Sequence, residues 1–188
     1  MRNWKKLSVL VLLAACTAAP TLDESAALEK GQGIASATFK ALSARLGAAM
    51  QSGGPAHAVE YCSLSALPLV DSISAAEGVH IKRTSERLRA PHDAPDADEE
   101  RALKVMREQW EQGDAAAVLS DVRLLGDSVA YYQPIFIGSP TCLKCHGTAG
   151  LELDSAAYAA IAEYYPDDAA IGYQIGELRG MWSVRWKH

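Results

Sequence analysis

The chain has 188 residues, of which 49% are hydrophobic and 22% are charged. This composition is typical of one globular domain with a single core and argues against a disordered chain. The formal net charge is −5, and it becomes −8 if the first 15 residues, with their three basic side chains, are removed. An acidic surface argues against nucleic acid or an anionic bilayer as the main partner, so we expect no nucleic-acid binding.

The start of the chain has the layout of a bacterial export signal. Basic residues precede an apolar run at 7–13, and small residues stand directly before Cys16. The apolar run is too short to remain in a membrane as a helix. LAAC at 13–16 also resembles a lipobox, in which the signal is removed and the cysteine is acylated. Cleavage of an ordinary secretory signal nearby is the alternative.

These features divide the chain into three parts. We expect a lipoprotein-type signal peptide at 1–15, a tether at 16–25 and the folded domain at 26–188. The mature protein is then a periplasmic lipoprotein, anchored to a bacterial membrane through Cys16.

The first half of the domain is predicted to be mainly helical. Residues 25–50 follow a helical pattern that QSGGP ends, and Pro55 can start a second helix. Pro68 is expected to kink or end that second helix, and Gly78 closes the segment.

Short strands and further helices follow. The predicted elements are a strand at 79–81, a loop at 87–97, a helix capped by Asp96 or Asp98 and running to Gln112, a hairpin at 118–137 around Gly126-Asp127-Ser128 with an edge or bulge at Pro134, a helix at 155–165 and a strand at 176–186. Helices around a small antiparallel sheet predict an α+β fold.

PTCLKCHG at 140–147 carries the most specific chemistry. Thiols at Cys142 and Cys145 lie on one helical turn and can add to the two vinyl groups of one haem, and His146 can then bind the iron. Covalent attachment of c-type haem takes place outside the cytoplasmic membrane, so the export signal strengthens this interpretation. A zinc site with Cys62 lacks a second close ligand pair, and a dithiol redox motif lacks the expected βαβ context.

The second axial position of the iron is open on this evidence. Candidates are Cys62, His57, His80, His92, His188, Met50, Met106 and Met181, or no residue at all. With Cys16 acylated and the motif cysteines alkylated, Cys62 is the one remaining free thiol in an oxidising compartment. It is either buried as a small hydrophobe or bound to iron as a thiolate, and His57 is the next candidate.

Four blocks of the sequence resemble a known family. They are AVEYCSLSA at 58–66, IKRTSERLRAPHDAPDADE at 81–99, YYQPIFIGSPTCLKCHG at 131–147 and YYPDDAAIGYQIGELRGMWSV at 164–184. In this order they resemble single-haem c-type cytochromes of a former unknown-function class, in which the haem domain has a PAS-like fold.

The resemblance implies a PAS-like antiparallel sheet with flanking helices and one covalently bound haem c. It also implies that His146 and Cys62 are the axial ligands of the iron. Ala90, His92 and Asp98 depart from the family pattern and change the contacts expected of their loop. Arg83, Arg89 and Arg179 are candidate partners of the haem propionates.

Two functions fit such a protein, and neither is enzymatic. With both axial positions filled, substrate cannot reach the iron without ligand loss, which argues against a peroxidase or oxygenase. The first function is a redox or small-gas sensor that signals to a separate periplasmic protein, because no output segment follows the domain. The second is a periplasmic electron carrier that docks a redox partner. Ligand exchange on reduction distinguishes them.

Overall fold

The structure is a computed structural model that describes residues 21–113 and 118–188. The predicted signal peptide, Cys16 and the first half of the predicted tether lie outside these residues. Within the described part, no helix is both long enough and apolar enough to cross a membrane.

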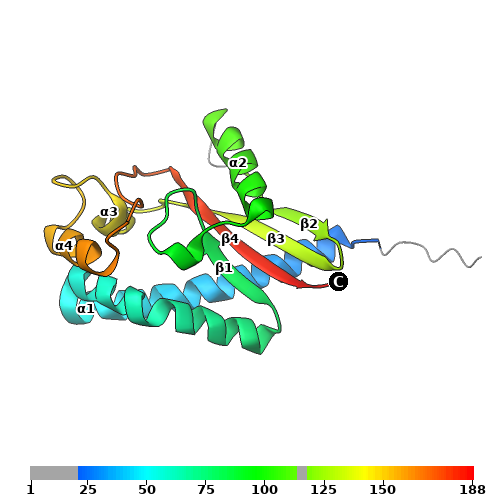
Figure 1. Ribbon diagram of the computed structural model, residues 1–188, viewed down its shortest axis with the longest axis horizontal. Coiled ribbons are helices and arrows are strands. Elements are labelled where there is room, and N and C mark those ends of the chain that lie inside the picture. The colour runs from blue at the N-terminus through cyan, green and yellow to red at the C-terminus, as the bar shows by residue number, and fades with distance from the viewer. Residues whose placement is uncertain (1–20, 114–117) are drawn as a thin grey trace, which may run out of the picture.

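The first element, α1 (Glu24–Glu77), folds back on itself as a helical hairpin (Figure 1). The side chain of Asp23 caps its start by accepting the N–H of Ala26 at 3.0 Å. The turn lies at Gly54, whose φ of 74° only glycine adopts without strain, so QSGGP separates two helical halves as predicted.

The helix does not end at Pro68, which was one of the two predicted outcomes, because the second half of α1 continues through it to Glu77. Proline removes a hydrogen bond to the carbonyl four residues earlier, which belongs to Leu64. Leu64 and Pro68 are both exposed, so water can bind the freed carbonyl. On the other side of the helix, Ala66 and Val70 are buried and hold this half in place.

A four-stranded antiparallel sheet in the order β1-β4-β3-β2 forms the centre of the fold. The strands are β1 (His80–Thr84), β2 (Asp121–Leu125), β3 (Ser128–Phe136) and β4 (Leu178–Lys187). The predicted hairpin is confirmed, with Gly126 and Asp127 as its turn. Pro134 lies beyond the last pair between β3 and β2, and a bulge follows it, as the missing N–H requires.

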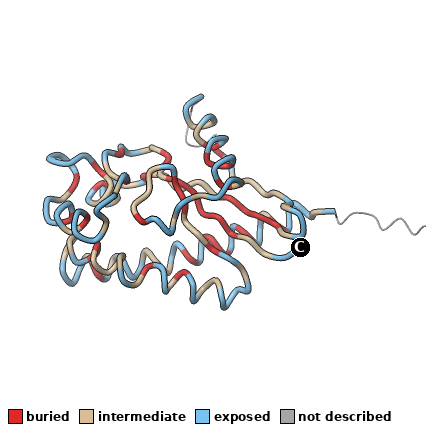
Figure 2. Tube along the Cα trace, viewed as in Figure 1, coloured by how far each residue is buried: buried red, intermediate tan, exposed pale blue. Residues whose placement is uncertain are grey.

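The two faces of the sheet are covered by different helices (Figure 1). Alternation along β3 places Tyr131 against α1 and Tyr132 against α2 (Ala97–Glu111), so each helix has its own apolar cluster. Figure 2 shows the buried residues concentrated in the strands and in the inward sides of the helices. Together with the antiparallel sheet, this arrangement confirms the α+β class.

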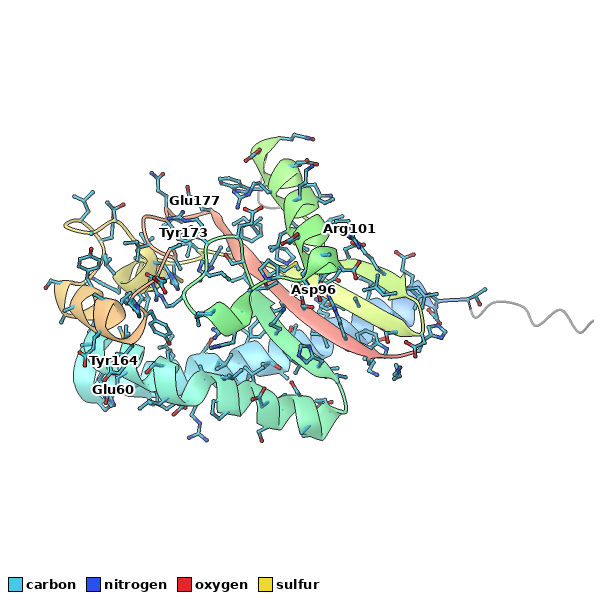
Figure 3. All side chains as sticks on the ribbon, in the orientation of Figure 1. Glu60, Asp96, Arg101, Tyr164, Tyr173 and Glu177 are labelled. Carbon is cyan, nitrogen blue, oxygen red and sulfur yellow. The ribbon has the colours of Figure 1, made fainter. Side chains whose placement is uncertain are left out.

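One end of the molecule holds α3 (Pro140–His146) and α4 (Ser155–Tyr164), close to the turn of α1 (Figure 1). The 3-10 helix η1 (Pro91–Asp93) lies beside β1. Val59 of α1 packs with Leu153, Ala157 and Ile161 of the α4 region, and Cys145 contacts the same cluster. Tyr164 of α4 and Glu60 of α1 also lie together (Figure 3). This end contains all the residues of the motif at 140–147.

Candidate functional site

The short helix α3 presents the two cysteines of the motif. Pro140 stands in its first turn, and the N–H of Gly147 closes it on the carbonyl of Leu143 at 2.8 Å. Cys142 and Cys145 are both partly buried free thiols on this helix. Three residues apart on a helix, their side chains project from the same face.

The ring of His146 is fixed by a backbone carbonyl. Its Nδ1 lies 2.7 Å from the oxygen of Ala170, and since a carbonyl only accepts, the ring proton is on Nδ1. Burial, followed by the positive charges of Arg89 and Arg179, keeps the pKa of His146 well below its usual range. The imidazole is therefore neutral at pH 7, and Nε2 carries the lone pair that a metal ion requires.

The loop between α4 and β4 encloses this histidine. The N–H of Gly172 donates to the carbonyl of Gly147, and that of Tyr173 donates to the carbonyl of His146, both at 2.8 Å. The buried ring of Tyr173 meets the His146 ring edge to face, with centroids 6.2 Å apart. The same loop joins the segment after β1, where the N–H of Ala169 donates to the carbonyl of Leu88 at 2.8 Å.

Cys62 lies in the second half of α1, one turn after Val59, and faces the site. Its thiol is close enough to Cys145 to raise the pKa of that residue, although burial raises it more. Burial also raises the pKa of Cys62 itself, against the opposing charges of Arg83 and Arg89. The structure thus brings Cys62 close to Cys145 of the motif and to Tyr165, whose pKa is raised to about 12 by burial and then by Cys62.

The three arginines named from the sequence also converge here. Arg89, Arg179 and Arg83 all contribute to the lowered pKa of His146. Arg89 forms a salt bridge with Asp168 at 3.1 Å. Among the described residues, neither Arg83 nor Arg179 has a carboxylate within salt-bridge distance. Asp93 is nevertheless near both: burial raises the pKa of Asp93, and the charges of Arg83 and Arg179 lower it.

The other candidate ligands lie elsewhere. His57, His80, His92 and His188 are exposed, and His57 is 3.4 Å from Glu60. Met106 and Met181 are buried in the cluster beneath α2 on the far face of the sheet, and Met50 is only partly buried near the turn of α1.

The two alternative uses of the cysteines find no support in the described residues. A zinc site needs several ligands close together. Within residues 21–113 and 118–188, no group of three or more His, Cys, Asp or Glu side chains is placed to hold a metal ion. All strand pairs in the sheet are antiparallel, so the βαβ context typical of thioredoxin-like dithiols is lacking there.

Three contributors to the site were missed by the sequence reasoning. Ala170 acts through its carbonyl, which no sequence pattern reveals. Tyr173 appears in the sequence as an ordinary aromatic residue. A role for Asp168 had one signal in the sequence. The two aspartates of YYPDD lie in one of the four blocks, and an arginine-rich block is a natural partner for acidic side chains.

Comparison with known proteins agrees with this arrangement. A family model described as Tll0287-like matches residues 17–186. The crystal structure of the cyanobacterial heme-protein Tll0287 has 27% sequence identity and a TM-score of 0.53, over 65% of this chain and 71% of that one. No curated protein matches. Since the family model spans nearly the whole sequence, the resemblance drawn from the four blocks is confirmed at the family level, and the chain belongs to the Tll0287-like family.

Proposed function

We propose that the protein binds one haem c covalently through Cys142 and Cys145. The observation that carries the proposal is the arrangement on α3, where two free thiols on one helical turn are followed by an imidazole with its Nδ1 bound to Ala170. A carbonyl on one ring nitrogen and a free second nitrogen is the usual arrangement of a metal-binding histidine. The solved heme-protein of the family supports the same cofactor.

The charges around His146 also fit haem. Arg83 and Arg179 bring two positive charges close to His146. Neither forms a salt bridge with a carboxylate of the described residues. Unpaired charges in such a position are costly unless an anion joins them. Haem carries two propionates, one for each arginine, and arginine binds carboxylates well because its N–H groups match their geometry.

Cys62 is proposed as the second axial ligand, opposite His146. Among the candidates, Cys62 lies close to Cys145 of α3. The four other candidate histidines are exposed, and Met106 and Met181 lie on the other face of the sheet. A thiol that coordinates a metal ion is deprotonated, which would overcome the effect of burial on its pKa. We also propose a PAS-like fold, with which the antiparallel sheet and its flanking helices agree.

We further propose that the protein is a redox or small-gas sensor rather than an enzyme. Haem supplies one iron that exchanges electrons and binds diatomic gases. Cys62 lies in the part of α1 that follows the glycine turn, so release of its sulfur would allow the segment around Cys62 to move while Ala66 and Val70 stay packed. An exported lipoprotein with Cys16 acylated would present this change to a signalling partner in the periplasm.

An electron-transfer cytochrome is the second candidate. Cys142, Cys145 and His146 are only partly buried, so a haem edge at this end of the molecule would be accessible to a redox partner. A carrier keeps both axial ligands on reduction, whereas a sensor loses one.

The proposal is tested by spectroscopy on the exported protein and its Cys62→Ala variant. Covalent haem is detected first, by haem staining of the denatured protein. Low-temperature EPR of the oxidised forms then reports the axial ligands, and carbon monoxide is added after reduction. His57→Ala serves as the matched control, since it removes a candidate ligand from the same helix at an exposed position.

Each step has a decisive outcome. Denatured wild-type protein without bound haem would disprove the proposal. A low-spin thiolate signal that is lost in Cys62→Ala and kept in His57→Ala assigns the ligand, and an unchanged spectrum in Cys62→Ala rejects it. Carbon monoxide binding to the reduced wild type supports the sensor, and failure to bind supports the carrier.

A further inference from the structure

One of the three arginines differs from the others in its contacts. The Nη2 of Arg89 donates to the carbonyl of Cys145 at 2.6 Å and to that of Ala170 at 3.3 Å. Its Nε and Nη2 also bind the two carboxylate oxygens of Asp168 at 3.1 and 3.2 Å. The N–H groups on these two nitrogens are thus engaged within the protein.

The contacts of Arg89 form a closed network around His146. Asp168 binds Arg89 and also accepts the N–H of Ala170 at 3.0 Å. The carbonyl of the same Ala170 accepts the Nδ1 proton of His146. Arg89 therefore joins the end of α3 to the residue that holds the imidazole, and Asp168 fixes the position of both.

We propose that Arg89 and Asp168 act as a pair of positioning residues that set the orientation and donor strength of the His146 ring. This inference rests on the proposed function, because it assigns Arg89 to the side of the axial histidine rather than to a haem propionate. Arg83 and Arg179 remain the partners of the propionates.

The physical effect on His146 has two parts. Outer-sphere partners fix the tautomer and the ring orientation of a ligating histidine. In addition, Arg89 holds the carbonyl of Ala170 where it accepts the Nδ1 proton, and this hydrogen bond raises the basicity of the ring. Without Arg89, the carbonyl loses one of the contacts that hold it, and the hydrogen bond from Nδ1 becomes weaker.

A neighbouring arginine provides a matched control. The Nε of Arg87 donates to the carbonyl of Ala169 at 3.1 Å, and its Nη2 binds the carbonyl of Ile171. Arg87 therefore binds the two residues that flank Ala170, and its guanidinium lies 4.0 Å from the centre of the Tyr173 ring, but it forms no hydrogen bond to Ala170 or to α3 among the described residues. Arg87→Gln removes the same charge from the same loop and keeps the hydrogen bonds that join Arg89, Asp168, Ala170 and His146.

The experiment compares Arg89→Gln, Arg89→Lys, Asp168→Asn and Arg87→Gln in the haem-loaded protein. Two properties are measured, the EPR g-values of the oxidised form and the solvent exchange of the His146 Nδ1 proton by nitrogen-15 NMR in the reduced form. We expect exchange to become faster and the g-values to shift in Arg89→Gln and Asp168→Asn. Lysine keeps the charge but not the two-pronged contact, so Arg89→Lys should behave like glutamine. Arg87→Gln should match the wild type.

The outcomes separate this inference from the proposed function. If Arg89→Gln and Asp168→Asn both keep wild-type exchange and g-values, the inference is overturned while the haem remains. If Arg89→Gln does not fold, Asp168→Asn decides alone, since asparagine can still accept the N–H of Ala170. If the wild type carries no covalent haem, the proposed function fails, and the exchange of the same proton in the haem-free protein still decides whether Arg89 holds His146.

Discussion

The contact between α1 and β3 allows a quantitative test of the fold with two neighbouring glycines. A Cβ built at Gly31 would lie 2.1 Å from the Cγ of Tyr131, whereas a Cβ at Gly33 would meet no atom within 4 Å. Tyr131 cannot retreat easily, because it is buried and its hydroxyl donates to the side chain of Gln133 at 2.8 Å. The helix can lie this close to the strand only because residue 31 has no side chain.

The two alanine variants should therefore change stability in opposite directions. Both gain about 0.5–1 kcal/mol from the preference of alanine over glycine within a helix. Gly33→Ala keeps this gain. Gly31→Ala must also separate α1 from β3, and overpacking of this kind costs about 1–3 kcal/mol. Because the helix preference is the same for both, the difference between the two free energies of unfolding isolates the packing cost.

Urea unfolding followed by far-UV circular dichroism measures this difference. The midpoint should rise for Gly33→Ala and fall for Gly31→Ala, with little change in the slope of free energy against urea. Equal stabilisation of both variants would refute the close packing of α1 on Tyr131.

The remaining predictions concern the end of α3 and the charges beneath α2. A Cβ at Gly147 would lie 2.6 Å from the carbonyl of Leu143, so Gly147→Ala should lower the yield of haem-loaded protein on a stained gel, and Gly138→Ala, with open space around it, should not. Glu99→Gln should lower the free energy of urea unfolding by about 2–3 kcal/mol, since it removes the negative charge of a fully buried carboxylate that lies 2.5 Å from Lys82 and 3.5 Å from Arg185. The hydrogen bond from Arg185 of β4 is the main reason that the pKa of Asp96 is lowered from 3.8 to about 2. The contribution of Asp96 to the free energy of unfolding is therefore complete above about pH 4 and is lost as the pH falls towards 2. That loss should be about 1 kcal/mol for this half-exposed carboxylate, and a pH series in which Asp96→Asn lost as much stability as the wild type would contradict it.

Most elements of the fold could be predicted because their signals are local. The glycines and proline at 53–55 end one helix and start another whatever surrounds them, and Asp96 caps α2 through the two N–H groups that follow it. Pro68 was misjudged because its effect depends on its surroundings. Leu64 and Pro68 are both exposed, so water can bind the freed carbonyl, and the buried Ala66 and Val70 hold the helix, which the sequence alone does not reveal.

The candidate site shows the same division between local and distant information. Cys142, Cys145 and His146 could be named because their chemistry requires adjacent residues in the chain. The group that holds His146 could not be named, because it is a backbone oxygen 24 residues further on. Hydrogen bonds to backbone depend on where a loop lies and leave no trace in side-chain identity.

The pairing of β1 with β4 explains why arginines far apart in the sequence lie close to His146. The register pairs Arg83 with Trp182 and Thr84 with Met181, so the chain leaving β1 runs beside the chain entering β4. Arg89 therefore meets Asp168, and the Nη1 of Arg179 reaches the carbonyl of Arg87 at 3.1 Å. Because the strands are antiparallel, the end of β1 lies beside the start of β4. The chain also leaves β3 for α3 at this end of the sheet. The positive charges thus gather around His146 as a consequence of strand order, and a shift of this register would separate them from it.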